Sequence, residues 1–217
     1  MLIAVRSLVM KTLVFATFMA IAAQTATAAP ITFTFTTAGA GTWTHSDGTT
    51  VNFDIDTPIE VILVAETSQL QNPTINYVNG QPIPGAIGYG QGTTVTATMS
   101  LAGAAMGALA NNTFVFRNGQ VVGFGDSVDF DIFGISNAAL TSYPLDTSLA
   151  PITGFGYFPG VTHIALASGD TVTLTALSQA RGVTLSAAVA PEVPEPATLS
   201  LLITGLAVVS VRRRLAR

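Results

Sequence analysis

The strongest constraint on the fold of this chain is an alternation of apolar and hydroxyl residues that begins near position 31. Residues 31–36 read Ile-Thr-Phe-Thr-Phe-Thr, and residues 51–55 alternate in the same way between apolar and polar side chains. Successive side chains of a β-strand point to opposite faces of a sheet, so this period of two places one face against a core and the other toward water. An amphipathic helix would need apolar residues three and four positions apart. The pattern therefore predicts half-buried β-strands.

Similar segments recur along the chain, separated by Gly, Asn, Asp and Pro. The segments of 112–116 and 120–124 flank Arg117-Asn118-Gly119, and Asn-Gly accepts positive φ at both central positions of a tight hairpin turn. No part shows strands alternating with longer helices, which a parallel sheet needs. The sequence therefore predicts an all-β fold, specifically an antiparallel β-sandwich. We expect its remaining strands at residues 42–44, 59–65, 93–99, 127–133, 171–177 and 183–189.

Three stretches rich in Gly, Ala or Pro do not follow this pattern. Residues 71–92 and 150–161 are expected to be loops, because Gly and Pro interrupt both repeatedly. Residues 101–110 are compatible with either a short helix or a tight bend. The side chains expected to face the core are Phe33, Phe35, Val51, Phe53, Ile62, Val64, Phe130, Ile132, Val172 and Leu174.

The first 28 residues have the layout of a secretory signal peptide. Arg6 and Lys11 supply a positively charged start, and residues 13–23 form the apolar segment, expected to be helical. Ala26 and Ala28 provide the small side chains of a cleavage site, which we expect to lie directly after Ala28. The chain is therefore predicted to be exported.

The composition of residues 29–193 excludes several classes of function. This stretch has two basic residues, Arg117 and Arg181, against eleven acidic ones, a net charge of −9. A surface of this charge repels nucleic acid and anionic lipid, so no nucleic-acid partner is expected. The chain has no cysteine, which excludes disulfides and thiolate metal sites. The length suits one domain with a sizeable core.

The C-terminus combines three features in a fixed order. Val193, Pro194, Glu195 and Pro196 form a short motif in which the prolines keep the backbone extended. Residues 197–211 carry no charge and would span roughly 22 Å as a helix, somewhat less than the ~30 Å of a bilayer core. The cluster of Arg212, Arg213 and Arg214 that follows predicts a stop-transfer signal on the cytoplasmic side.

The Pro-Glu-Pro motif, short apolar helix and terminal arginines together resemble the PEP-CTERM sorting signal. That resemblance implies recognition and removal of the tail by exosortase, a membrane-embedded enzyme, in a bacterium that makes exopolysaccharide. The chain then divides into a signal peptide (1–28), an extracellular β-domain (29–192) and a sorting signal (193–217). The protein is expected to be held in the membrane in transit and then to reach the cell surface or biofilm matrix.

The two histidines are the first candidates for chemistry in the central region. His45 and His163 lie among Thr, Ser and Gly, and a metal site would need them to converge with a carboxylate such as Asp47. We expect them to be solvent-facing loop residues instead. No metalloprotease helix motif or nucleophile elbow occurs. The sequence therefore predicts no enzyme and no obligatory cofactor.

Closely spaced aspartates are the second candidates. Asp54 and Asp56 are two residues apart, as are Asp129 and Asp131, with Asp126 nearby. Carboxylates two apart on a strand share a face, and extracellular calcium binds such oxygens. The spacing does not match an EF-hand loop. Asp126, Asp129 and Asp131 are thus weak calcium candidates.

Three functions remain compatible with the sequence. The first is a non-enzymatic surface or matrix protein. The second is a secreted hydrolase, for which no set of catalytic residues can be assembled. The third is a carbohydrate-binding module, which is favoured if aromatic rings flank a groove and disfavoured if they are buried. The rings that could stack on sugars are Trp43, Tyr77, Tyr89, Tyr143, Phe155, Tyr157 and Phe158.

Overall fold

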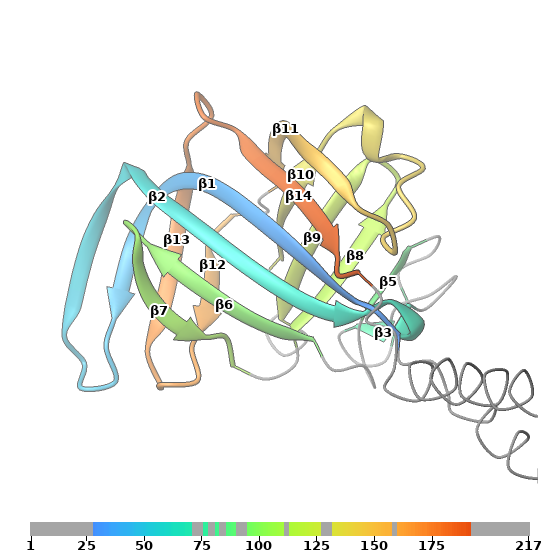
Figure 1. The fold of residues 1–217 in the computed structure, drawn as a ribbon. Coiled ribbons are helices and arrows are strands. Elements are labelled where there is room, and N and C mark those ends of the chain that lie inside the picture. The colour runs from blue at the N-terminus through green and yellow to red at the C-terminus, as the bar shows by residue number, and fades with distance from the viewer. Residues whose placement is uncertain are drawn as a thin grey trace, which may run out of the picture. The chain divides into compact units, whose positions relative to one another are not determined.

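The described part of the chain is built from antiparallel strands, which confirms the all-β prediction (Figure 1). The computed structural model describes residues 28–70, 76–77, 81–82, 86–89, 95–110, 113–126, 132–157 and 160–191. Residues Ala29–Ala190 form one compact unit. Two short 3-10 helices, Thr67–Gln69 and Ala138–Leu140, interrupt the strands of this unit.

Twelve strands join into one sheet, in the order β5-β8-β9-β10-β11-β14-β1-β2-β6-β7, with β13 also pairing β1 and β12 pairing β13. Strands β3 and β4 form a separate short hairpin. The strands are β1 (Pro30–Thr44), β2 (Thr50–Glu66), β3 (Asn76–Tyr77), β4 (Gln81–Pro82), β5 (Ile87–Tyr89), β6 (Thr96–Leu101), β7 (Ala104–Ala108), β8 (Thr113–Asn118), β9 (Val121–Asp126), β10 (Ile132–Ser136), β11 (Leu149–Tyr157), β12 (Thr162–Ala165), β13 (Thr171–Leu177) and β14 (Val183–Val189).

Strand β1 is paired along both of its edges. One edge pairs with β2, while the other pairs first with β14 and then, from Gly39 onward, with β13. After the change of partner the backbones of β1 and β13 approach very closely. A Cβ atom at Gly39 would lie 2.6 Å from the carbonyl oxygen of Ala176, and one at Gly41 would lie 2.0 Å from that of Thr173. Glycine allows such approaches where any side chain would collide. Gly39 and Gly41 therefore allow β13 to pair with the second half of β1.

Strand β2 carries an irregularity opposite this point. Gly39 pairs with Thr57 and Gly41 with Phe53, so one β1 residue faces the three β2 residues 54–56. Extra residues in one strand bend it and increase its twist. Residues of β2 before Pro58 pair only with β1 among the described strands, since β6 pairs with Ile59–Val64. We call the projecting part of this hairpin, residues 41–53, the arm.

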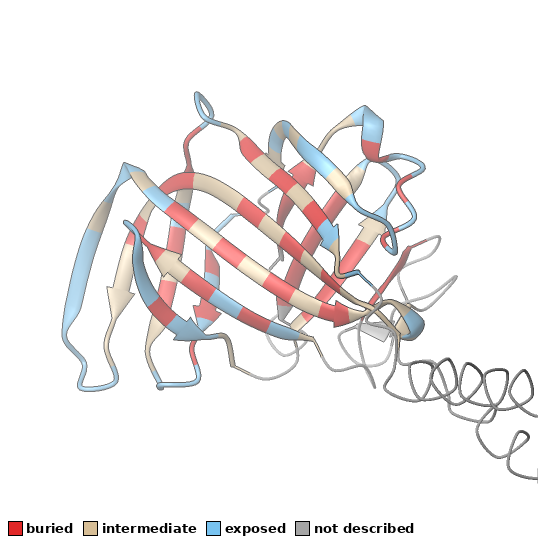
Figure 2. Ribbon diagram, viewed as in Figure 1, coloured by how far each residue is buried: buried red, intermediate tan, exposed pale blue. Residues whose placement is uncertain are grey.

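The sheet folds over, so that distant strands pack against each other. β11 pairs with β10 on one edge and with β14 on the other, which joins the two layers expected of a sandwich into one sheet. The Phe35 ring contacts the Phe124 and Phe133 rings, with centroids 5.2 and 6.3 Å apart. Figure 2 shows buried residues alternating along β1, β2 and β14. The core therefore lies between β1 and the β9–β10 hairpin.

Hydrogen bonds also join the end of β7 to the end of β12. Leu109 and Leu166 form an isolated bridge, and the Ala167 N–H donates to the Ala108 carbonyl oxygen at 2.9 Å. Since β12 pairs with β13, and β13 with β1, the strands β12-β13-β1-β2-β6-β7 form a closed ring. The ring positions the arm opposite the β6–β7 hairpin.

The predicted core is partly wrong along β2. Phe33, Phe35, Val172 and Leu174 are buried as predicted. Val51, however, is 50 % exposed, and Phe53 is half-buried against the core. The side chains of Phe130 and Ile132 lie outside the described residues.

Ile62 and Val64 were predicted to face the core, but they are half-buried on the opposite face of β2. Val61 and Leu63 face the core, because β1 pairs Phe33 with Leu63 and Phe35 with Val61. Both faces of residues 59–65 are largely apolar, so the sequence pattern does not indicate which face of the strand points to the core. Pairing with β1 sets the register.

The predicted loops are also partly wrong. Most of the predicted loop 150–161 belongs to strand β11, Leu149–Tyr157, where a register shift between Leu149 and Ile152 accommodates Pro151. Strands β3, β4 and β5 lie within 71–92. In 101–110 the structure has a hairpin, with Ala102 and Gly103 at φ values of 52° and 80°, which is the conformation of a tight hairpin turn.

Strands β13 and β14 have the predicted bounds, 171–177 and 183–189. The expected helices of the signal peptide and of residues 197–211 lie outside the described residues. Within the part of the chain that the structure describes, no helix has the length and apolar character needed to cross a membrane.

We predict that Phe35→Ala lowers the free energy of unfolding by about 3–5 kcal/mol, because it opens a cavity between the two layers. Phe155→Ala is the matched control, since Phe155 is 78 % exposed on β11, and it should cost less than about 1 kcal/mol. Urea unfolding followed by circular dichroism measures both. Equal losses in the two variants would contradict this packing.

Candidate functional site

The arm is held to the β12–β13 turn through Asp170. The Trp43 indole N–H donates to Asp170 Oδ2 at 3.1 Å, and the Ser46 backbone N–H donates to Oδ1 at 2.9 Å. His45 Nδ1 lies 3.6 Å from Oδ2, and the Trp43 and His45 ring centroids are 4.0 Å apart. A single carboxylate therefore fixes the position of the indole ring and the tip of the arm.

These contacts also set the charge of the carboxylate. The Ser46 backbone N–H holds the pKa of Asp170 below its ordinary value, with further lowering by Trp43 and His45. At the arm tip, the hydroxyl and backbone N–H of Thr49 donate to Asp47 and lower the pKa of that carboxyl. Asp170 thus accepts hydrogen bonds that join the β12–β13 turn to the arm, and Asp47 accepts hydrogen bonds within the turn at the arm tip.

An open groove of about 630 Å³ lies between the arm and the β6–β7 hairpin. Ligand pockets commonly have volumes of about 300–1,000 Å³, so this groove is large enough for several sugar rings or a short peptide. Its apolar wall includes Trp43, Val51 and Phe53 from the arm and Met106 from β7, and its polar lining residues are Asn52, Asp54 and Thr57.

The structure divides the candidate stacking aromatics into two groups. Tyr89 is fully buried and Tyr143 is 6 % exposed, and their hydroxyls donate to the carbonyl oxygens of Leu145 and Thr147. Burial raises the pKa of both phenols. These two tyrosines are core residues and are not available to a ligand. The side chains of Tyr77 and Phe158 lie outside the described residues.

Phe155 and Tyr157 form a second exposed aromatic surface. They are 78 % and 40 % exposed, and they share the outer face of β11 because they are two residues apart. Their cross-strand neighbours on β10, Ser136 and Gly134, are small. This surface offers rings to solvent, but these two residues do not line the arm groove.

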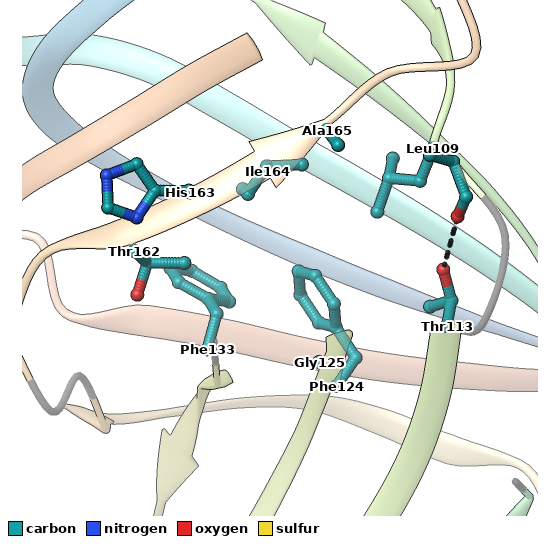
Figure 3. Close-up of a pocket in the computed structure, with 10 residues that line it drawn as sticks. Leu109, Thr113, Phe124, Gly125, Phe133, Thr162, His163, Ile164 and Ala165 are labelled. Carbon is teal, nitrogen blue, oxygen red and sulfur yellow. Dashed lines mark hydrogen bonds between the residues drawn. The ribbon is translucent and has the colours of Figure 1, made fainter. Parts of the chain in front are cut away.

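A small internal cavity lies where β12 meets β9 and β10. The rings of Phe124 and Phe133 and the side chain of Ile164 line it, and the Thr113 hydroxyl donates to the Ala110 carbonyl oxygen at its edge (Figure 3). Its volume is about 20 Å³, enough for one water molecule. We regard it as a packing gap and not as a ligand site.

The predicted metal candidates do not converge in the described structure. His45 lies beside Asp170, whereas His163 is on β12 opposite Thr173. Asp54 accepts hydrogen bonds from the Asp56 backbone N–H and the Thr57 hydroxyl, both at 3.1 Å. Among the residues described, no three His, Asp or Glu side chains group closely enough to hold a metal ion.

For two sets of predicted site residues the structure does not describe the side chains. The backbone of Asp126 ends β9, but its side chain is not described, and Asp129 and Asp131 are outside the described residues. Calcium binding by these three residues therefore remains a prediction. The sorting residues Val193–Pro196, the arginines 212–214 and Ala26 are also outside them.

Sequence reasoning did not assign a role to Asp170. In the sequence Asp170 is one acidic residue directly before the expected strand 171–177, while its partner Trp43 is 127 positions away. A half-buried indole N–H needs an acceptor, but several acidic residues could have supplied one. Only the pairing of β1 with β13 brings these two together.

Comparison with known proteins identifies the tail. Residues 192–214 match the family model of the PEP-CTERM protein-sorting motif, which confirms the resemblance seen in the sequence. The motif indicates an exosortase-sorted protein that is exported to the surface or the exterior of the cell. No curated protein and no solved structure matches the chain.

We predict that Asp170→Asn lowers the melting temperature at pH 7, because the amide cannot accept from both Trp43 and Ser46 as a carboxylate does. The pKa of Asp170 is lowered in the folded state from 3.8, so its contribution is present above that pH and is lost as the pH falls further. The difference between parent and variant should therefore shrink below pH 3.8.

Calorimetry from about pH 7 to pH 2 measures this difference. Asp56→Asn is the control, since it also removes one negative charge, from an exposed carboxylate 3.8 Å from Arg181 Nε. A constant difference for Asp170→Asn across the whole range would contradict the assignment.

Proposed function

We propose that this protein is a non-enzymatic surface or extracellular-matrix protein that exosortase processes and that associates with exopolysaccharide. The observation that carries the proposal is the PEP-CTERM match at residues 192–214 directly after the β-domain. In transit, residues 197–211 anchor the chain as a helix, with Arg212–Arg214 on the cytoplasmic side. The predicted signal peptide directs export.

The termini of the β-domain support removal of the tail. β14 pairs with the start of β1, with Ile31 opposite Val189, and the Ala190 N–H donates to the Pro30 carbonyl oxygen at 2.9 Å. The matched motif begins two residues later. Cleavage at the motif would leave every described strand pair intact, so the domain is suited to persist after its tail is removed.

Three of the described carboxylates have structural uses that support a non-enzymatic role. Asp47, Asp54 and Asp170 each accept hydrogen bonds from neighbouring backbone or side-chain groups. A catalytic acid or base needs a pKa near the working pH, whereas the pKa values of Asp47 and Asp170 are lowered. Their hydrogen bonds stabilise turns, which is a structural use.

We predict that Glu195→Ala blocks processing while leaving insertion intact. Glu195 is the charged residue between the two prolines, so it is the expected specificity contact, whereas the apolar segment and arginines are unchanged. The measurement is the mass and the location of the protein in a strain that contains exosortase. The variant should keep its tail and stay with the membrane.

Glu192→Ala is the matched control, because it removes a neighbouring carboxylate and leaves Pro194-Glu195-Pro196 unchanged. The control should mature like the parent. If Glu195→Ala also matured and reached the surface normally, the sorting function would be refuted, and the tail would be a plain membrane anchor.

A further inference from the structure

We propose that the groove between the arm and the β6–β7 hairpin binds an uncharged glycan chain. This inference rests on the proposed function, since it names the ligand class that a matrix protein of this kind would take. It depends on the arrangement of the groove lining, which has Trp43 and Phe53 on one wall and polar residues of β2 beside them.

The aromatic wall is rigid before any ligand arrives. The Trp43 indole is fixed by its hydrogen bond to Asp170 and by the His45 ring 4.0 Å away. The Phe53 ring packs over Gly41, since a Cβ atom there would lie 2.8 Å from Phe53 Cζ. Sugar rings present apolar C–H faces, and flat aromatic walls held in place bind them without a large ordering cost.

Polar groups beside these rings match the hydroxyls of a sugar. Asp54 and Thr57 line the groove with oxygen atoms that can accept hydrogen bonds, and Asn52 is the third polar residue of the lining. Apolar walls with a few well-placed polar groups are the usual composition of a small-molecule site. A purely apolar ligand would leave these groups without new partners.

The charge of the groove selects against acidic glycans. Its lining includes Asp54 and no Lys or Arg, and the domain around it carries a strong excess of negative charge. A polymer rich in uronate or sulfate would be repelled by this potential. The expected ligand is therefore a chain of uncharged sugars.

An extended peptide is the alternative occupant, because one edge of β2 before Pro58 has no partner among the described strands. Asp54 accepts from the Asp56 backbone N–H in this part of β2, and Asp54 and Asp56 place two exposed carboxylates along it. Charged side chains on an edge strand act against the addition of another strand. The edge is thus protected where a peptide would have to pair.

The test uses the exported protein purified from its producing strain. Trp43 is the single tryptophan of the chain, so its fluorescence reports on the groove directly. The probes are cellohexaose, xylohexaose, mannohexaose and hexa-N-acetylchitohexaose, with polygalacturonate as the acidic glycan and the peptide Val-Lys-Val-Lys-Val-Lys as a strand probe. We expect a saturable change with at least one uncharged hexasaccharide and none with polygalacturonate.

Variants then locate the site by calorimetry. Phe53→Leu removes the ring but keeps an apolar side chain, and Thr57→Val replaces a hydroxyl of the groove lining with a methyl group of similar size. We expect the Kd for the bound hexasaccharide to rise about tenfold in Phe53→Leu and about threefold in Thr57→Val. Phe155→Ala and Tyr157→Ala, on the β11 surface, are the matched controls and should leave the Kd unchanged.

Three results would overturn the proposal. One is the absence of binding by all four hexasaccharides at millimolar concentration. Another is a loss of binding in the β11 variants with none in Phe53→Leu, which would place the site on β11. The last is a response to the peptide alone, which would assign the groove to strand addition. None of these changes the outcome of the Glu195→Ala maturation assay, so failure here is distinguishable from failure of the sorting function.

Discussion

Strand β1 must pair with three partners at once, and the rest of the domain depends on how it does so. Its first half pairs with β14 and its second half with β13, while β2 follows the other edge throughout. Gly39 and Gly41 permit the pairing with β13, because no side chain fits between their backbones and those of Ala176 and Thr173. The first half then supplies Phe33 and Phe35 to the core, and the second half becomes the arm.

The groove and the sorting tail follow from the two ends of this arrangement. At one end, β2 bends at residues 54–56 and leaves the arm facing the β6–β7 hairpin, with Asp170 fixing the indole that lines the gap. At the other end, β14 closes against the start of β1, so the domain is complete before residue 192. The tail can therefore direct sorting without taking part in the fold of the domain.

The sequence was sufficient for elements that show clear alternation or turn chemistry. The bounds of β13 and β14, the existence of the β8–β9 hairpin and the sorting motif were all predictable. The turn of that hairpin is one residue later than expected, at Gly119 and Gln120, because Asn118 pairs with Val121 and does not have positive φ. It was insufficient where both faces of a strand are apolar, as around Ile62, or where Pro and Gly occur in a paired strand, as in β11. The Trp43–Asp170 contact and the groove depend on strand order, which local patterns do not contain.

Amide hydrogen exchange of the mature protein tests the central role of β1 most directly. Exchange protection follows the free energy of the opening that exposes each amide. We expect the β1 amides from Ile31 to Thr36, paired between β2 and β14, to exchange only on global unfolding. Amides of β5 and β7, the short strands at the two ends of the strand order, should exchange sooner. Exchange of the β1 amides before those of β5 and β7 would contradict the central role of β1.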